Sequence, residues 1–353
     1  MRTIAVLNQK GGVGKTTTVA NTAAALAASG SKVAVIDLDP QAHLTIHLGL
    51  EPQTLEKSSY RVLIQSSRFS DDIMMVRPNL WLLPANIDLV GAESELVSVV
   101  GRETILREAL EPVQEQFDYC LIDCAPSLGL LTLNALAAAQ EILIPLQPHF
   151  LALQGFGKLL QTVELINKRI NPHLRVTGIL LCMFDSRASL PNEVRNDIET
   201  FLENARGTDS AWSRARILPT FIRRNIKLAE APSYGKTIFE YEMNCHGAED
   251  YLEVARFIHQ MDAKEPTPLP SQPDHPVMPI VPVSETQHDV GKAEKTVEQA
   301  TCSDMENSTP PIKILEFEEM HRSHRPAECE PREPGAVQDA IGPPSVRPPY
   351  STE

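Results

Sequence analysis

The sequence predicts an α/β protein with a doubly wound, mostly parallel sheet and helices on both faces. Two observations point to this fold class. Short apolar runs alternate with helical patterns along residues 1–263, and a glycine-rich segment separates the first apolar run from the first helix. A third observation sets the extent of the folded part, because 16 of the 28 prolines lie in residues 264–353. We therefore expect one large α/β domain followed by a disordered tail.

The first 40 residues have the pattern of a strand–helix–strand unit. Ile4–Leu7 and Val33–Ile36 are short apolar runs typical of buried parallel strands. Between them, Thr16–Ser29 is an alanine-rich helical pattern that Gly30 ends. The same alternation continues along the chain. Further strands are expected at Leu80–Pro84, Cys120–Ile122, Ile142–Ile144 and Val176–Cys182, and further helices at Ala92–Val100, Glu103–Ala109, Thr132–Ala139, Leu151–Asn171, Leu190–Asn204 and Tyr251–Met261.

The expected domain and the expected tail differ in charge. Of the formal net charge of −14, residues 1–263 carry −6 and residues 264–353 carry −8. A mildly acidic domain gives no global attraction to nucleic acid, so such binding needs a local basic patch. In the tail, the apolar run Ile312–Phe317 is either a short docking motif or an incidental cluster.

Several classes of protein are disfavoured by composition. No stretch reaches 18 apolar residues and no signal-peptide pattern precedes the first strand, so we expect a cytoplasmic protein. None of the six cysteines has C-x-x-C spacing, which disfavours a disulfide framework. We expect Cys120 and Cys124 to be small buried apolar side chains.

A glycine-rich segment, Gln9–Thr17, has the sequence QKGGVGKTT between the first strand and the first helix. Its glycines allow backbone N–H groups to converge on phosphate oxygens, and the helix adds the positive end of its dipole. Lys15 would reach the β- and γ-phosphates, and the Thr16 hydroxyl would bind Mg²⁺. The usual G-x-x-x-x-G-K-[ST] pattern is altered, because Gln9 replaces the first glycine and a second lysine, Lys10, opens the loop. The expected nucleotide contacts are Lys10, Gly11, Gly12, Val13, Gly14, Lys15, Thr16 and Thr17.

Carboxylates follow two of the predicted strands. Asp37 and Asp39 lie in the segment DLDPQ, and Asp123 ends the apolar segment YCLID. A carboxylate at the carboxyl end of a parallel strand faces the ligand crevice of a doubly wound sheet. Asp123 would hold Mg²⁺ through water, or it would be a capping or turn carboxylate. Met183 and Asp185 lie just after the expected strand Val176–Cys182, at the same edge of the sheet, and are candidates for an adenine pocket.

The K-G-G-x-G-K-T form of the loop resembles the deviant Walker A motif of the ParA/MinD ATPases. The resemblance continues in residues 123–129 (DCAPSLG), 132–136 (TLNAL) and 225–236 (NIKLAEAPSYGK) and covers about residues 1–261. The last of these segments is similar to ParA/Soj-type chromosome-partitioning ATPases in particular. The resemblance implies the P-loop NTPase fold, ATP and Mg²⁺ as ligands, and slow ATP hydrolysis that a partner stimulates.

The resemblance also implies roles for single residues. Lys10 would cross a homodimer interface to the partner's nucleotide, Asp39 would position the attacking water, and Asp37 would lie near Mg²⁺. The ATP-bound dimer would bind nucleoid DNA without sequence preference and would work with a ParB-like partner. The expected DNA contacts are Arg187, Arg223, Arg224 and Lys227, which could equally form a solvated charged face. One departure concerns Arg223, which stands where the family commonly has a proline that contacts adenine through its backbone.

Two other functions share the phosphate loop. A membrane-surface regulator like MinD needs a basic amphipathic C-terminus, whereas this C-terminal stretch is acidic and rich in proline. An iron–sulfur carrier needs suitably spaced cysteines, which this sequence lacks. Within the partition-like architecture, the cargo could be a chromosome, a plasmid, a chemotaxis array or a microcompartment.

Overall fold

The computed structural model describes residues 1–262, and residues 150, 151 and 262 by their backbone alone. The expected tail, residues 264–353, and its apolar run Ile312–Phe317 lie outside the described residues. In the described part, nine strands are arranged in the order β3-β4-β2-β5-β1-β6-β7-β8, with β9 paired to β7. The strands are β1 (Arg2–Val6), β2 (Val33–Leu38), β3 (Met74–Arg77), β4 (Leu80–Leu83), β5 (Tyr119–Cys124), β6 (Glu141–Leu146), β7 (Arg175–Phe184), β8 (Arg216–Ile217) and β9 (Ile222–Arg223).

All strand pairs are parallel except β3 with β4, which is antiparallel and lies at one edge. Every residue of β2 and β5 is buried, as expected for strands with helices on both faces. Cys120 and Cys124 are fully buried free cysteines within β5, which confirms the expectation for both. The predicted fold class, a doubly wound and mostly parallel sheet, is confirmed.

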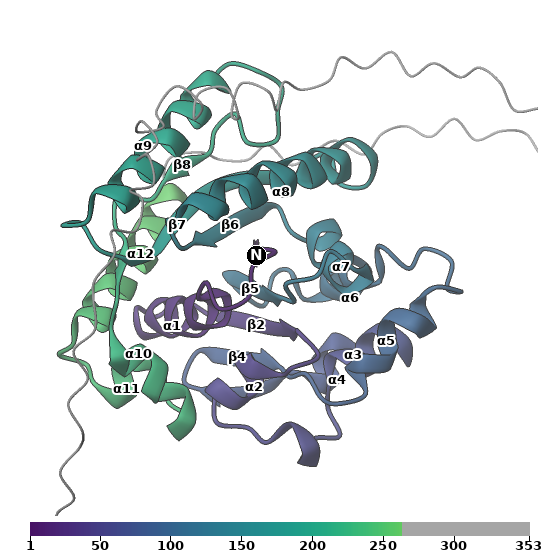
Figure 1. The fold of residues 1–353 in the computed structure, drawn as a ribbon. Helices are drawn as coiled ribbons and strands as arrows, with labels where there is room; N and C mark the ends of the chain where they lie inside the picture. Colours follow the sequence, from purple (N-terminus) through teal and green to yellow (C-terminus); the bar gives the residue numbers. More distant parts are fainter. Residues whose placement is uncertain (263–353) are drawn as a thin grey trace, which may run out of the picture. The chain divides into compact units, whose positions relative to one another are not determined.

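Helices cover both faces of the sheet. Figure 1 shows α1 and α12 on one side of the central strands and α6 and α7 on the other. The helices are α1 (Lys15–Ala28), α2 (His43–His47), α3 (Ser59–Ile64), α4 (Phe69–Asp72), α5 (Leu89–Leu96), α6 (Ile105–Leu110), α7 (Leu130–Ala138), α8 (Phe150–Arg169), α9 (Ser189–Asn204), α10 (Ile226–Glu230), α11 (Ile238–Tyr241) and α12 (His246–Asp262), with 3₁₀ turns at Pro52–Thr54, Glu111–Val113 and Ala231–Tyr234. Within residues 1–262, none of these helices could cross a membrane.

The region between β2 and β5 differs most from expectation. The helix expected at Ala92–Val100 is observed at Leu89–Leu96 and ends before Val97. Leu89 and Leu96 are fully buried, whereas Val100 is 98% exposed. The apolar residues that contact the core therefore fix the helix, and the exposed valines that follow it do not continue it.

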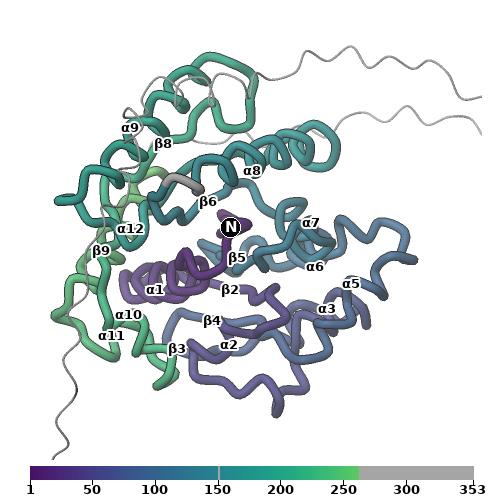
Figure 2. Tube along the Cα trace, in the orientation of Figure 1, coloured from purple at the N-terminus to yellow at the C-terminus, as the bar shows by residue number. Residues whose placement is uncertain are grey.

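The last elements pack against the first helix. Figure 2 shows β9, α10 and α11 beside α1 and α12, and contacts join α1 to α11 and α12 to β9. Inside this layer the Tyr251 hydroxyl of α12 lies 3.3 Å from the Thr18 hydroxyl of α1. The segment from β9 to α12 is thus part of the same folded body as the phosphate loop, and α12 begins five residues before the expected Tyr251.

Candidate nucleotide-binding site

The phosphate loop, residues 9–14, connects β1 to α1. The φ angle is +73° at Gly12 and +97° at Gly14, in the left-handed region that side chains rarely adopt. Gly14 is also the N-cap of α1, which begins at Lys15. The N-terminus of a helix presents unpaired N–H groups and the positive end of the helix dipole. The backbone geometry therefore suits an anion such as a phosphate group.

The side chain of Lys15 lies against the inside of this loop, and the residue is 7% exposed. Its Nζ donates a hydrogen bond of 3.3 Å to the main-chain carbonyl of Lys10. Burial lowers the pKa of Lys15, while the nearby carboxylates of Asp123 and Asp39 act in the opposite direction. Because an ammonium group has three N–H donors, Lys15 can also bind an anion held by the loop.

Asp123, in β5, carries a carboxylate without a partner. Both of its oxygens are buried, and neither has a hydrogen bond within residues 1–262. Burial is the main cause that raises the pKa of Asp123 well above its usual value, and the neighbouring Asp37 adds to it. The nearby Thr16 side chain and then Lys15 act in the opposite direction. A buried carboxylate is costly unless it is paired or binds a cation. Asp123 and the Thr16 hydroxyl supply the oxygen ligands that Mg²⁺ prefers, so these residues fit the predicted metal.

Asp37 lies opposite Asp123 in the register of β2 and β5, but its carboxylate is fully engaged. Its Oδ1 accepts a hydrogen bond from the main-chain N–H of Asp39 at 3.1 Å. Its Oδ2 accepts from the main-chain N–H of Thr45 at 2.9 Å and from the Thr45 hydroxyl at 2.7 Å. Burial raises the pKa of Asp37 to about 6 although these hydrogen bonds lower it. Asp37 therefore fixes the turn between β2 and α2, and no local sequence signal pointed to Thr45.

Asp39 lies in this turn and is 9% exposed. Its Oδ1 accepts a hydrogen bond from the main-chain N–H of Gln41 at 2.9 Å. Its carbonyl accepts from Ala42, whose φ of +53° closes the turn before α2. The Asp39 carboxylate acts on the Lys15 ammonium, so the turn places a carboxylate at the phosphate-binding edge.

Lys10, the second lysine of the loop, is exposed. Its main-chain N–H donates to Asn8 Oδ1 at 3.0 Å, and Asn8 Nδ2 donates to the Pro145 carbonyl at 2.7 Å. Its ammonium group contacts Nε2 of His149, which precedes α8. A cavity of about 260 Å³ opens beside Lys10 and His149. Neither Asn8 nor His149 was predicted. Asn8 adjoins the loop in the chain, whereas the pairing of β1 with β6 brings His149 to it.

The expected adenine-pocket residues lie at the end of β7. Met183 has a φ of +52°, at an irregularity of the pairing between β7 and β9. The preceding Cys182 faces the phosphate loop, since a Cβ atom built at Gly14 would lie 3.7 Å from its Sγ. Asp185 is exposed and accepts hydrogen bonds from the main chain and Nε of Arg187, which lower the pKa of Asp185. The structure therefore brings the end of β7 next to the loop.

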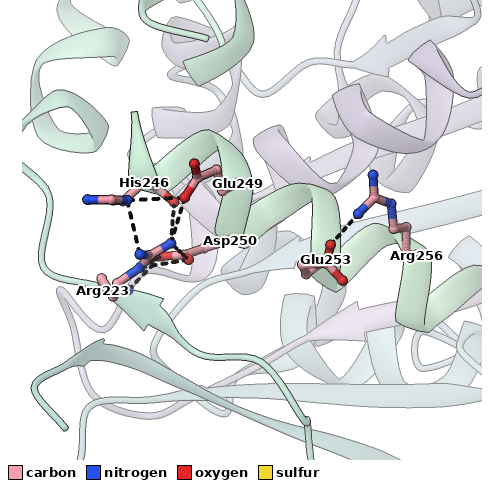
Figure 3. Close-up of polar contacts among 6 residues, drawn as sticks. All are labelled: Arg223, His246, Glu249, Asp250, Glu253 and Arg256. Atoms are coloured by element: carbon pink, nitrogen blue, oxygen red, sulfur yellow. Dashed lines mark hydrogen bonds and ion pairs between the residues drawn. The ribbon is translucent and has the colours of Figure 1, made fainter. Parts of the chain in front are cut away.

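Arg223 is tied to the start of α12, as Figure 3 shows. Its guanidinium group forms a salt bridge of 2.5 Å with Asp250 and one of 3.0 Å with Glu249, and it lies 3.0 Å from His246 Nδ1. The Asp250 side chain is 7% exposed. The hydrogen bonds that the Arg223 side chain donates to Asp250 raise the pKa of Arg223 further. The charge of Arg223 is thus largely balanced within the domain.

The other expected DNA contacts differ in their surroundings. Lys227 forms a salt bridge of 3.0 Å with Glu230 and lies over the ring of Tyr241. Arg187 pairs with Asp185, whose pKa is also lowered by Arg224. Arg224 is exposed and forms no hydrogen bond or ion pair inside the described range. Arg187 and Arg224 therefore lie around one carboxylate at the edge formed by β7 and β9.

Comparisons with known proteins agree with this geometry. A family model described as an AAA domain matches residues 1–176. The sporulation initiation inhibitor protein Soj of Bacillus subtilis is 43% identical over 254 residues, which are 72% of this chain and 96% of Soj. The chain belongs to the ParA/Soj family of chromosome-partitioning ATPases.

Two further comparisons, one with a curated relative and one with a solved structure, cover most of the described fold. The chromosome partitioning protein ParA of Myxococcus xanthus is 41% identical over 265 residues, which are 74% of this chain and 89% of that protein. The cobyrinic acid a,c-diamide synthase of Mycobacterium smegmatis, solved with ADP and magnesium, superposes with a TM-score of 0.64 at 37% identity. That alignment covers 75% of this chain and 96% of the solved chain.

Proposed function

We propose that this ParA/Soj-family protein is a Mg²⁺-dependent ATPase that dimerises when ATP is bound and then binds DNA without sequence preference. A ParB-like protein would stimulate hydrolysis, and the cycle would move or position a chromosome or plasmid. The observation that carries the nucleotide part is the buried, unpartnered carboxylate of Asp123 beside Lys15 and the phosphate loop. The similarity to the chromosome partitioning protein ParA of Myxococcus xanthus supports the partition part.

In the proposed ATPase, each residue has a separate task. The backbone of the phosphate loop and Lys15 would bind the phosphates, and Thr16 and Asp123 would hold Mg²⁺. When bound, Mg²⁺ neutralises charge that develops on the phosphate oxygens. Asp39 would accept a hydrogen bond from the attacking water and orient it. Because phosphoryl transfer demands little covalent chemistry of the protein, placement of these groups accounts for most of the catalysis.

Asp37 would support the Mg²⁺ site indirectly, because both of its carboxylate oxygens already accept hydrogen bonds. Its carboxylate accepts one hydrogen bond from the main chain of Asp39 and two from Thr45 in α2, so it acts on the site by holding the turn between them. Asp37 would thereby keep Asp39 in place while Asp123 faces the metal. This division separates a positioning carboxylate from a ligand-facing one on two adjacent strands.

For the DNA surface we propose the edge around Asp185, where Arg187 and Arg224 lie. Both side chains are exposed and can rearrange to contact phosphates. Lys227 would also contact DNA, with a DNA phosphate replacing Glu230 as its ionic partner. Arg223 would act by holding this edge against α12, because its guanidinium group is already engaged by Asp250.

A binding titration tests the proposal. The Asp39→Ala protein is titrated into a fluorescent random-sequence duplex with Mg²⁺ and ATP, ADP or no nucleotide, at low and high salt. We expect binding with ATP alone, and weaker binding at high salt because phosphate contacts release counterions. Absence of binding in every condition would contradict the DNA role. Anionic liposomes then replace the duplex, and ATP-dependent liposome binding would instead support a MinD-like membrane role.

A further inference from the structure

Lys10 is held at three points within its own protomer. Its main-chain N–H is fixed by Asn8, which is anchored to Pro145 at the end of β6. Its carbonyl accepts the hydrogen bond from Lys15. Its ammonium group contacts His149, three residues after the end of β6. The third contact is distinct from the other two, because it occupies the side-chain charge by which Lys10 would reach another protomer.

The chemistry of the contact fixes the state of His149. An ammonium group has donors and no acceptor, so Nε2 of the imidazole must accept and the ring must be neutral. Burial and the charge of Lys10 lower the pKa of His149, which favours this neutral state at physiological pH. His149 itself has an extended backbone (φ −148°, ψ 160°) directly before α8, so the strand-to-helix turn sets the position of its ring.

Among the described residues, no other charged side chain lines the cavity beside this contact. The cavity beside the pair is lined by Lys10, His149 and residues without titratable groups, namely Asn8, Gln9, Val13, Leu146, Gln147, Ala152 and Gly155. Lys10 is the charged group that acts on the pKa of His149. The pair is therefore a simple donor–acceptor contact at the mouth of a cavity, with room for Lys10 to leave it.

We propose that His149 is a positioning residue that retains Lys10 on its own protomer and so opposes the movement of Lys10 to a partner's nucleotide. This inference rests on the proposed ATP-dependent dimer. Each protomer must break one Lys10–His149 contact before its lysine crosses the interface. Protonation of His149 removes the acceptor and places two positive charges together, so acidification releases Lys10.

The size of the effect follows from the exposure of the contact. Solvent screening limits an exposed contact to a charged group, so it changes an equilibrium constant by roughly threefold. Two such contacts open for each dimer, so loss of His149 as an acceptor should strengthen dimerisation by about tenfold. A neutral acceptor of similar reach should preserve the retention and abolish its dependence on pH.

The first measurement tests the contact in nucleotide-free monomer. The full chain is labelled with ¹³C-histidine, and its imidazole resonances are titrated by NMR, with His149 assigned from His149→Gln. We expect the pKa of His149 to lie below its ordinary value and to rise in Lys10→Met. This variant keeps a side chain of similar length without the charge. His173, exposed in the loop after α8, is the internal reference. An unchanged His149 titration in Lys10→Met would overturn the contact.

The second measurement tests the consequence. Sedimentation at a series of protein concentrations with saturating ATP, in the Asp39→Ala background, compares His149→Leu, His149→Gln and the control His173→Gln. We expect His149→Leu to dimerise about tenfold more tightly. We expect His149→Gln to match the parent at pH 7.5 and to lack the parent's tightening toward pH 6. Equal dimerisation of His149→Leu and the parent would overturn the retention. A parent that stays monomeric would refute the proposed dimer, and the NMR titration would then decide the contact alone.

Discussion

The nucleotide site and the junction of β9 with α12 both concentrate charged residues, but they leave those charges in opposite states. At the nucleotide site, the Asp123 carboxylate is buried and lacks a hydrogen-bond partner within the described range. At the junction, Arg223 is engaged by Asp250, Glu249 and His246. The sequence places candidate functional residues in both regions, because Arg223 was an expected DNA contact.

The two regions differ in whether a charged side chain has a partner within its own domain. A buried charge without an internal partner is destabilising by itself and is explained by a ligand that completes it. A charge that is paired within its own domain is less available to a ligand, and removing it leaves its buried partner uncompensated, which destabilises the fold. Removing a residue of the first kind should therefore affect binding or turnover, and removing one of the second kind should affect stability.

Lys15→Ala should give the largest effect. We expect nucleotide affinity to fall by more than about 100-fold, because the buried ammonium supplies a charge-assisted hydrogen bond to the phosphates. Isothermal titration calorimetry with ATP and Mg²⁺ measures this nucleotide affinity. Lys158→Ala, which removes an exposed lysine of α8, is the matched control and should bind as the parent does. Undiminished affinity in Lys15→Ala would refute the loop assignment.

Asp39→Ala separates turnover from binding at the same site. We expect ATP affinity and DNA binding to be retained while the hydrolysis rate falls by about 100-fold, since orientation of the water is lost. A phosphate-release assay with and without the stimulating partner measures the rate. Asp71→Ala, which removes an exposed carboxylate of α4, is the control. Parent-level hydrolysis in Asp39→Ala would show that another group orients the water.

Arg224→Ala and Arg223→Ala test the comparison most directly. Loss of Arg224 should weaken DNA binding about threefold to tenfold, with unchanged thermal stability. The slope of log affinity against log salt concentration should become shallower by about one. Loss of Arg223 should lower the free energy of unfolding by about 2 kcal/mol, because Asp250 remains buried without its partner. Duplex titrations and chemical denaturation measure the two effects. A reversed pattern would place the DNA contact at the junction.

His47 gives the smallest expected effect. Burial, with Arg77, lowers its pKa to about 4 in the fold, against 6.5 ordinarily. Between these values the unfolded chain binds more protons, so the contribution of neutral His47 is complete above pH 6.5 and is lost as the pH falls toward 4. From pH 7.5 to 5.5 the parent should lose about 1 kcal/mol relative to His47→Gln.

Chemical denaturation of the two proteins at both pH values measures this difference. The raised pKa of Asp37, about 6, acts in the opposite direction but is common to both proteins and cancels. Equal pH dependence of parent and variant would show that His47 is not held neutral by burial.

The described fold follows closely from local patterns. Apolar runs at β1, β2 and β5 predict buried parallel strands because helices on both faces leave no polar face. The phosphate loop is predictable because its glycines and lysines are adjacent in the chain. By contrast, the helix α2, the strand β3 and the two-residue strands β8 and β9 are too short for a periodic signal, and contacts with neighbouring elements determine them.

The α/β class, the phosphate loop and the strand-end aspartates are predictable from the sequence, since they depend on residues close together in the chain. The pairing of the charged side chains depends on the tertiary fold. This fold places Thr45 on Asp37, Asp250 on Arg223 and His149 on Lys10. The last two pairs are separated by 27 and 139 residues. No local spacing encodes such contacts, because they form only when strand order and helix packing bring the partners together.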